Sequence, residues 1–600
     1  MMPERADTAP GSAVSRPLRM GIMCSGTVFD AWQAACIREA LSLPFVRPAL
    51  LVIDDQPNPG GAATKRSVLD RLTRNPRAGW NLYNRLFVRG KSVAARPVDL
   101  AAELAGVPSV RCTAPRRGKW ARVFTESEIA AIREHDLDFI LRFAFNIVKG
   151  EILTTPRLGV WSFHHDDLDA YRGPPACFWP MYFGDPVQGV TLQRLTEGID
   201  NGVVLARAHL ATIPHSYVRN RDAAFMGAAW MPAKVCRDIR AGAAHYVDAP
   251  PSRTTAPNRT LPTNAQTIRF AITVGARKVA NAAKWLSRHD QWAVGIIDKP
   301  IHELLHADRC PPARWIRPES RGSILADPFG VTRDGRLTVM CEELSDRDGR
   351  GRIVAIECSE NGGVGAARTI MDRPVHLSYP YLFEWEGGLY CVPESGEAAR
   401  ADILRSAAFP DRWEKVGTIV ENFAALDTTV FRHDGRWWAL ASKKEGPSGL
   451  SLHAWHTEKL TGPWVAHAAN PLKCDIRSTR PAGTPFVHDG ALYRPAQDCS
   501  RTYGGAVAFC RVDRLTPTEF SETVVSVLSP VPDGPFARGL HTVSAVGGRT
   551  LIDGKRWVFA PRQFWAQCAK FLGRGGRSGA VRLDAGAAAR PVHAGDAGVV

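Results

Sequence analysis

The chain has 600 residues, of which 45% are apolar and 23% are charged, and its formal net charge is +16. This length exceeds one ordinary hydrophobic core, so the sequence predicts two or more domains; because it contains no run of eighteen or more apolar residues, we expect no membrane span. Thirteen cysteines without CxxC pairs or zinc-ligand spacing argue against a disulfide framework and against a metal site.

The first predicted elements belong to a mostly parallel sheet. Residues 1–17 lack the apolar segment of a signal peptide, so we expect a disordered leader and a cytoplasmic protein. A strand from Leu18 to Cys24, a helix from Phe29 to Leu43 and a strand from Pro48 to Asp54 then form a βαβ unit. We expect this α/β domain to cover residues 18–245.

A basic segment follows, from Lys65 to Arg122, with fourteen Lys or Arg against three acidic residues. Such a charge excess would attract folate glutamates, a nucleotide-sugar diphosphate, nucleic acid or an acidic membrane surface. The alternative is a solvated loop without a ligand. Nucleic acid is not favoured, because Trp80, Tyr83 and Phe87 have helical spacing, which is typical of packing rather than of stacking on bases.

Polar side chains gather at the ends of two predicted strands. One strand runs from Leu137 to Phe145 and is followed by Asn146, and another runs from Gly159 to His165. In the second strand Ser162, His164 and Asp166 share one face, because side chains alternate along a strand. Ligands of open α/β sheets bind beyond the carboxyl ends of the strands, so Asn146 and His164 are expected at one mouth.

The segment after this strand completes a candidate site. A turn-rich loop from Asp169 to Pro175 contains Arg172 and Gly173. A hairpin is predicted from residues 189–195 and 203–210, with Asp200 at its tip. A histidine at a strand end and an acid in a tight turn could handle a proton together.

These motifs resemble the formyltransferase family, which transfers a formyl group from 10-formyltetrahydrofolate to an amine. The matching motifs, in the order of the chain, are Ser162-Phe163-His164, Tyr171-Arg172-Gly173, Pro175, Gly184-Asp185, Gly189-Val190-Thr191 and Asp200-Asn201-Gly202. The resemblance implies 10-formyltetrahydrofolate as the donor. It also implies catalytic roles for His164, Asp200 and Ser162, and substrate or cofactor binding by Asn146, Asp166, Arg172 and Gly173.

The sequence departs from the family at Ser162, where the family has an asparagine that stabilises the oxyanion. Losing one such donor typically costs roughly 100- to 1000-fold in turnover. A serine could donate a hydroxyl hydrogen over a shorter reach, and Asn146 could supply an amide instead. Three interpretations stay open: an active variant, a changed acyl donor or acceptor, and a retained fold that only binds.

The second half of the chain has a different pattern. The α/β domain ends with a helix predicted from Asp222 to Ile239, and a linker and a connecting helix over residues 246–290 lead into this half. A strand–turn–strand phrase then recurs from Asp327, Tyr379, Asp427, Pro481 and His541, at spacings of 52, 48, 54 and 60 residues. Such repeats predict five propeller blades over residues 291–572, closed by a strand from Trp292 to Ile297, before a disordered tail at 573–600.

This half resembles the five-bladed propellers of glycoside hydrolases, and more closely the N-terminal domain of plant glucosamine inositolphosphorylceramide transferases. The motifs are Ala326-Asp327-Pro328-Phe329, His376-Leu377-Ser378-Tyr379-Pro380, Pro393-Glu394-Ser395 and Arg494-Pro495-Ala496-Gln497-Asp498. The likeness covers residues 315–522 and implies a glycan-related role.

Blade starts converge near a propeller axis, so a candidate sugar site can be assembled from them. Glycoside cleavage requires one carboxylic acid and one carboxylate, roles that Asp327 with Glu394 or Asp427 could fill. Cleavage, sugar binding and a purely structural role stay open. The full candidate set is Asp327, His376, Glu394, Asp427, Arg480, Asp498 and His541.

The sequence therefore predicts a multidomain protein, an α/β Rossmann-like formyltransferase domain followed by an all-β five-bladed propeller. We expect it to N-formylate, or otherwise acylate, an amino sugar or sugar nucleotide in surface-glycan synthesis, with the propeller engaging the glycan. The alternatives are a glycoside-active propeller beside a degenerate formyltransferase-like domain, and a non-catalytic carbohydrate-binding protein. A transfer RNA formyltransferase is disfavoured, because that family carries a small β-barrel after its catalytic domain. The oligomeric state is not predicted.

Overall fold

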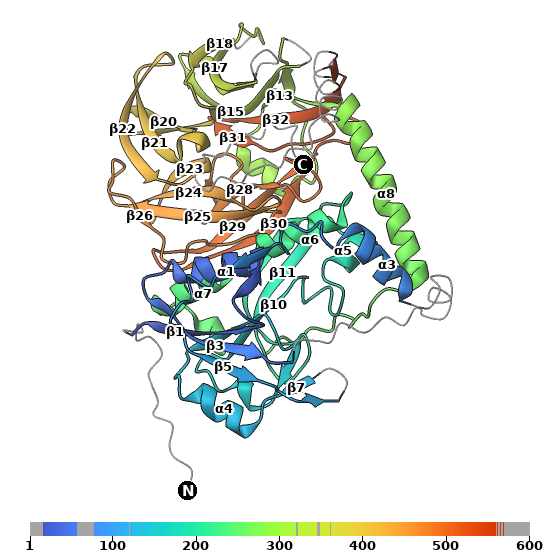
Figure 1. The fold of residues 1–600 in the computed structure, drawn as a ribbon. Coiled ribbons are helices and arrows are strands. Elements are labelled where there is room, and N and C mark those ends of the chain that lie inside the picture. The colour runs from blue at the N-terminus through green and yellow to red at the C-terminus, as the bar shows by residue number, and fades with distance from the viewer. Residues whose placement is uncertain are drawn as a thin grey trace. The chain divides into compact units, whose positions relative to one another are not determined.

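The computed structural model describes residues 16–56, 77–118, 121–319, 322–344, 349–359 and 362–559, together with residues 561, 564, 565 and 568. The predicted tail, nearly all of the predicted leader and part of the basic segment lie outside these residues. The chain divides into two compact units, residues 1–276 with 445–449 and residues 277–444 with 450–600. This boundary falls between the predicted domain limits at 245 and 291. We describe each unit by itself (Figure 1).

The first unit is built on a seven-stranded sheet with the order β12-β11-β10-β8-β1-β3-β5. Strands β5, β3, β1, β8 and β10 are parallel neighbours, and β11 and β12 are added antiparallel at one edge. The pairing of β11 with β12 confirms the hairpin predicted around Asp200. The strands are β1 (Leu18–Cys24), β3 (Val46–Asp54), β5 (Ser109–Cys112), β8 (Phe139–Arg142), β10 (Val160–His164), β11 (Val187–Arg194) and β12 (Val203–Ala211).

The described helices of this unit begin and end where local sequence requires. Thr125 and Glu128 form a reciprocal capping box at α4: the Thr125 amide donates to Glu128 Oε2 at 2.8 Å, and the Glu128 amide donates to Thr125 Oγ1 at 3.3 Å. The helix predicted from Asp222 to Ile239 is wrong in its bounds. Two helices occupy this stretch, because the second begins anew with Pro232 in its first turn.

The remaining elements of the first unit are short, apart from α8, which runs across the boundary between the units. The helices are α1 (Ala31–Leu41), α3 (Ala78–Phe87), α4 (Glu126–Arg133), α5 (Phe178–Phe183), α6 (Tyr217–Met226), α7 (Met231–Arg240) and α8 (Asn264–Ser287), with 3-10 turns at Glu151–Leu153 and His245–Asp248. The minor strands are β2 (Val28–Asp30), β4 (Pro97–Asp99), β6 (Arg116–Arg117), β7 (Ala121–Val123) and β9 (Ile147–Lys149).

The second unit consists, in its described part, of five four-stranded antiparallel sheets, a propeller-like set. In four of the sheets a two-residue turn joins the first strand to the second. These turns are Asp334-Gly335, Glu386-Gly387, Asp434-Gly435 and Asp489-Gly490. Both residues of each turn have positive φ, which is the geometry that lets a two-residue turn follow the strand twist. The repeated turn in the sequence therefore marks the middle of each of these hairpins.

The bounds of these strands follow the predicted repeats. The first four sheets are β15 (Ile324–Arg333), β16 (Arg336–Leu344), β17 (Gly351–Cys358) and β18 (Arg368–Met371); β19 (Ser378–Trp385), β20 (Gly388–Glu394), β21 (Arg400–Ala408) and β22 (Arg412–Glu421); β23 (Leu426–His433), β24 (Arg436–Glu445), β25 (Gly449–Thr457) and β26 (Val465–Ala466); β27 (Phe486–His488), β28 (Ala491–Asp498), β29 (Ala506–Leu515) and β30 (Phe520–Leu528). Two 3-10 turns lie at Ile301–His306 and Gly396–Ala398.

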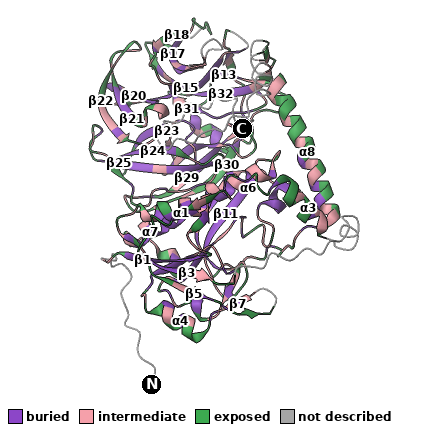
Figure 2. Ribbon diagram, in the orientation of Figure 1, coloured by how far each residue is buried: buried purple, intermediate pink, exposed green. Residues whose placement is uncertain are grey.

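The fifth sheet joins strands from the two ends of the unit. Its order is β14 (Arg314–Ile316), β13 (His289–Ile297), β32 (Arg549–Val558) and β31 (Val543–Val546). Strand β13 pairs with β32 from His289 opposite Val558 to Ile297 opposite Thr550. This confirms the prediction that the strand near Trp292 pairs with the last repeat. Figure 2 shows these central strands as buried.

Candidate functional site

The first unit places a histidine beside an aspartate at the end of β10. The His164 Nδ1 lies 3.5 Å from Asp200 Oδ1, and His164 Nε2 lies 2.9 Å from the Tyr171 carbonyl oxygen. The Gly173 amide donates to Asp200 Oδ2 at 3.2 Å. Both ring nitrogens therefore face acceptors, an arrangement that favours the doubly protonated ring.

The pKa values of this pair follow from the same contacts. Burial would lower the pKa of His164, but the Asp200 carboxylate, together with the Asp166 charge and the Tyr171 carbonyl oxygen, holds the pKa above its ordinary value. Burial would raise the pKa of Asp200, and the hydrogen bond and charge of His164 bring it below its ordinary value. Each partner therefore favours the charged form of the other.

An arginine that the sequence analysis did not single out completes this site. Arg142, the last residue of β8, donates to the Ser162 hydroxyl from Nε at 3.2 Å and from Nη2 at 2.7 Å. Its Nη1 donates to the carbonyl oxygens of Ala144, at 3.5 Å, and of Asn146. Burial lowers the pKa of Arg142 to about 10, and the charge of Asp200 acts in the opposite direction.

Two predicted binding residues have other immediate partners. Asn146 is exposed, and the contact described above uses its backbone carbonyl rather than its amide. Asp166 is buried, accepts from the Cys177 amide at 3.1 Å and accepts from Gln188 Nε2 at 3.0 Å. Burial raises the pKa of Asp166 to about 7. Asp166 lies within electrostatic reach of His164.

Arg172 and Gly173, in the loop after β10, contact a later segment of the chain around residues 256–259. Arg172 Nε donates to the Ala256 carbonyl oxygen at 2.8 Å. Gly173 has φ of +82°, and a Cβ there would lie 2.0 Å from the Arg259 carbonyl oxygen, so only glycine fits. These contacts hold the loop in the position from which the Gly173 amide donates to Asp200.

A hollow of about 430 Å³ lies among strands near the Asp200 turn. Its lining includes Arg117, Lys149 and Glu197, and Glu197 accepts a hydrogen bond from the Gly150 amide at 2.8 Å. This volume is in the range of small-molecule sites. Arg117 is a described member of the basic segment, so part of that charge faces this hollow.

In the second unit, one group of predicted residues meets around Asp427. Arg480 donates to Asp427 through Nε and, at 3.1 Å, through Nη2, and Gln497 Nε2 donates to the same carboxylate at 2.8 Å. The Asp427 amide donates to Glu394 Oε2 at 2.8 Å, and Arg480 lies 3.8 Å from Glu394. Burial would lower the pKa of Arg480, but the Asp427 charge raises it well above its ordinary value.

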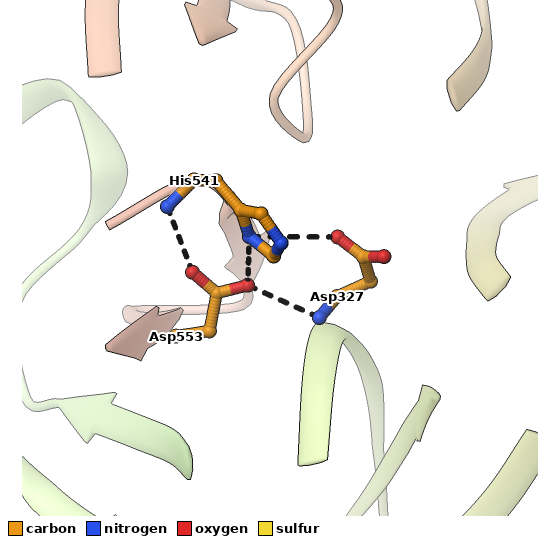
Figure 3. Close-up of side chains that lie close together, drawn as sticks. All are labelled: Asp327, His541 and Asp553. Atoms are coloured by element: carbon orange, nitrogen blue, oxygen red, sulfur yellow. Dashed lines mark hydrogen bonds and ion pairs between the residues drawn. The ribbon is translucent and has the colours of Figure 1, made fainter. Parts of the chain in front are cut away.

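A second group meets around His541 (Figure 3). His541 Nδ1 is bonded to Asp553 and lies 3.7 Å from Asp327, and all three residues are buried. Thr542 Oγ1 donates to Asp327 Oδ1 at 2.7 Å. The Asp327 and His541 amides donate to Asp553 at 3.1 and 2.9 Å. Burial raises the pKa of Asp327 to about 7.

The spacing of this second group is also compatible with metal ligands, since their ligand atoms lie within 4.8 Å of one another. The sequence analysis expected no metal. Backbone amides, Thr542 and the His541 ring already occupy carboxylate oxygens of both aspartates. These bonds link β15 and β32 to His541 and Thr542, which directly precede β31.

The other two predicted residues of this unit have separate partners. His376 Nε2 lies 3.1 Å from Glu342 Oε1, and its Nδ1 accepts from the Gly351 amide at 3.1 Å. Burial lowers the pKa of His376 and Glu342 raises it, with a net value of about 9. Asp498 accepts from the Ser500 amide at 2.9 Å, as a turn residue does. The structure thus distributes the predicted set over several networks.

Sequence reasoning missed Arg142, Glu342, Gln497 and Asp553. Arg142 had a usable signal, because it is the one charge in the run FILRFAFN and a charge in a buried strand requires a partner. Glu342 and Asp553 lie within second strands of the repeats, whereas the candidates predicted from second strands, Glu394 and Asp498, are their last residues.

Part of the second unit is similar to a family of known proteins. Residues 315–532 match the family model of the N-terminal part of glucosamine inositolphosphorylceramide transferase 1. That protein from Oryza sativa subsp. japonica is 30% identical over 211 residues, 34% of this chain and 28% of the relative. The Arabidopsis thaliana protein of the same name is 30% identical over 34% of this chain and 27% of the relative. The match thus spans about a quarter of these relatives.

The chain is also similar to formyltransferases. The methionyl-tRNA formyltransferase of Caulobacter sp. (strain K31) is 25% identical over 47% of this chain and 79% of the relative. Among solved structures, a phosphoribosylglycinamide formyltransferase from Bacillus halodurans has 16% identity and a TM-score of 0.24, over 36% and 94% of the two chains. A family 117 glycoside hydrolase from Zobellia galactanivorans has 12% identity and a TM-score of 0.28, over 41% and 92%.

Proposed function

We propose that the first unit transfers a formyl group to the amine of an amino sugar or sugar nucleotide. The observation that carries this proposal is that the His164–Asp200 pair and the Arg142–Ser162 contact lie together where the neighbouring strands β8 and β10 end. Asp200 supplies a carboxylate that can accept a proton, and Arg142 supplies positive charge beside the Ser162 hydroxyl. Attack of an amine on a formyl carbon requires both.

Arg142 is the residue to which we assign oxyanion stabilisation. A guanidinium has five N–H donors, and the four bonds described above leave one Nη2 hydrogen. The Ser162 oxygen accepts twice from Arg142, so its own hydrogen is available to a ligand. Both His164 nitrogens are already engaged, which leaves Arg142 and Ser162 to replace the family's asparagine amide.

Asp200 is the proton acceptor in this proposal. His164 keeps the Asp200 carboxylate ionised, and the Gly173 amide fixes its second oxygen. When bound, 10-formyltetrahydrofolate would supply the formyl group, and the cationic and hydroxyl donors suit the negative charge that develops on its carbonyl oxygen. Arg117 and Lys149 in the nearby hollow would attract the anionic part of a sugar nucleotide.

For the second unit we propose a closed five-bladed propeller that engages the glycan. The contacts of Asp427 with Gln497 and of Asp327 with Asp553 support closure, because each links strands of different sheets. The similarity to the N-terminal part of the plant transferases supports a glycan ligand. The occupied carboxylate of Asp427 favours binding over cleavage. All thirteen cysteines are free thiols, which supports the proposed cytoplasmic location.

The test is transfer of labelled formyl from 10-formyltetrahydrofolate to a panel of amino sugars and their nucleotide derivatives. We expect the full chain to label at least one acceptor, and His164→Ala and Asp200→Asn to abolish labelling while the thermal unfolding temperature stays within a few degrees. Lys459→Glu, an exposed change in the second unit, is the matched control. Labelling that persists in both site variants would contradict the proposal.

A further inference from the structure

Helix α8 is apolar on the side where a surface helix is ordinarily polar. Thr267, Phe270 and Val274 form its buried side. Ile268 is 60% exposed and Ile272 is 67% exposed, and Val279, seven residues further along, is 71% exposed. Residues separated by four and seven positions share one helix face. An isolated exposed apolar residue is ordinary, but a stripe along one face indicates an interaction surface.

Helix α3 adds a second exposed apolar group beside α8. The Tyr83 ring lies 5.7 Å from that of Phe270, so α3 packs on the buried side of α8. Leu86 and Phe87 nevertheless are each 52% exposed. Figure 2 shows large parts of both helices as exposed. We call the stripe of exposed apolar residues on α8, Ile268, Ile272 and Val279, the apolar patch.

The stretches that contain α3 and α8 carry charges of one sign. Residues 77–98 and 264–288 contain no Asp or Glu. Ten basic residues lie in these two stretches: Arg77, Arg85, Arg89, Lys91, Arg96, Arg269, Arg277, Lys278, Lys284 and Arg288. Arg269 and Lys278 lie on the two sides of the α8 stripe by helical spacing. An apolar partner that is also anionic would satisfy both features.

We propose that the apolar patch docks on the surface of an anionic lipid membrane. A helix with exposed apolar residues flanked by Lys and Arg lies in the interface plane, with its apolar side chains at the boundary of the headgroups and the acyl chains. Of the described helices, none is long and apolar enough to cross a bilayer. The attachment is therefore peripheral. This inference goes beyond the proposed transfer reaction and does not depend on it.

Vesicle co-sedimentation of the full chain tests the proposal. We expect binding to vesicles of phosphatidylcholine with one third phosphatidylserine, little binding to pure phosphatidylcholine, and weakening as salt rises. The triple change Ile268→Gln, Ile272→Gln and Val279→Gln should reduce binding at least tenfold. The matched control is Val465→Gln with Val487→Gln, two exposed apolar residues of the second unit.

A charge variant separates the two contributions. Arg269→Glu with Lys278→Glu should reduce binding to the anionic vesicles at least tenfold, whereas Lys459→Glu with Arg501→Glu should leave it unchanged. All altered residues are solvent-facing, so unfolding temperatures should not move. The proposal is overturned if no vesicle binds, if the triple variant binds as well as the parent, or if sedimentation shows a dimer that the triple variant abolishes, since a second copy would then cover the patch.

Discussion

The Arg142 guanidinium holds the Ser162 hydroxyl with two hydrogen bonds, at 3.2 and 2.7 Å. The resemblance to formyltransferases led us to expect a loss at Ser162, because a serine is shorter than the family's asparagine. The structure places a cation from the neighbouring strand at that position. In the function proposed above, a charged donor therefore takes the role of the family's neutral one.

Removing the Arg142 guanidinium should lower the rate of formyl transfer more than it weakens substrate binding. We expect Arg142→Met to lower kcat about 100- to 1000-fold, because a donor to the developing oxyanion is lost. Arg142→Lys should retain part of the rate, since it keeps the charge without the planar fork. Steady-state kinetics with unfolding curves measure this. Equal kcat values for Arg142→Met and the parent would refute the assignment.

The Asp200 carboxylate should control the protonation of His164. The pKa of His164 lies above its ordinary value because Asp200, Asp166 and the Tyr171 carbonyl oxygen together outweigh burial. In Asp200→Asn the largest opposing contribution to burial is lost, so the pKa of His164 should fall relative to the parent, although the Asp166 charge and the Tyr171 carbonyl oxygen still raise it. NMR titration of the imidazole in both proteins tests this directly, without an activity assay. Asp136→Asn, an exposed change, is the control.

Breaking the Asp427–Arg480 pair should destabilise the second unit. Arg480 is largely buried, and Asp427→Asn leaves its charge with Glu394 at 3.8 Å as the nearest described carboxylate. Removal of one partner of a buried ion pair costs about 3–5 kcal/mol. Urea unfolding should show this loss. Asp498→Asn should change the free energy of unfolding by less than about 0.5 kcal/mol. A stable Asp427→Asn variant that loses glycan binding would instead indicate a binding role.

The His376–Glu342 pair should make stability fall in alkaline solution. The pKa of His376 is about 9 in the folded protein and about 6.5 when unfolded. A raised folded pKa contributes stability that is fully present below pH 6.5 and is lost as pH rises through 9. The unfolding temperature should therefore decline over this window, and less so in His376→Gln. Parallel curves for the two proteins would contradict the assignment.

The sequence predicts local structure well where one face of an element is buried. Alternation of side chains located Ser162 and His164 on β10, and the turn residues located the hairpin that carries Asp200. It did not predict which strand lies beside β10. The contact between Arg142 and Ser162 depends on that pairing of β8 with β10, which joins residues 20 positions apart.

Prediction from the sequence is limited in the same way for the second unit. The repeats identified the hairpins, because each has its own turn residues. They placed Asp427 and Arg480 in one candidate set, but they did not identify Asp553, on a strand of another sheet, as the partner of Asp327. These contacts join residues 53 and 226 positions apart. Position within one repeat carries no information on such partners.

The pairing of β13 with β32 determines when the second unit can be completed on the ribosome. Strand β13 is synthesised first and its partner last, with Ile297 opposite Thr550. At about 5–20 residues per second, β13 waits roughly 10–50 s for β32. During this interval its apolar residues Trp292, Val294 and Ile296, which are buried in the finished protein, have no strand partner of their own sheet beyond β14. A nascent chain interrupted before residue 549 would therefore be a ready substrate for chaperones.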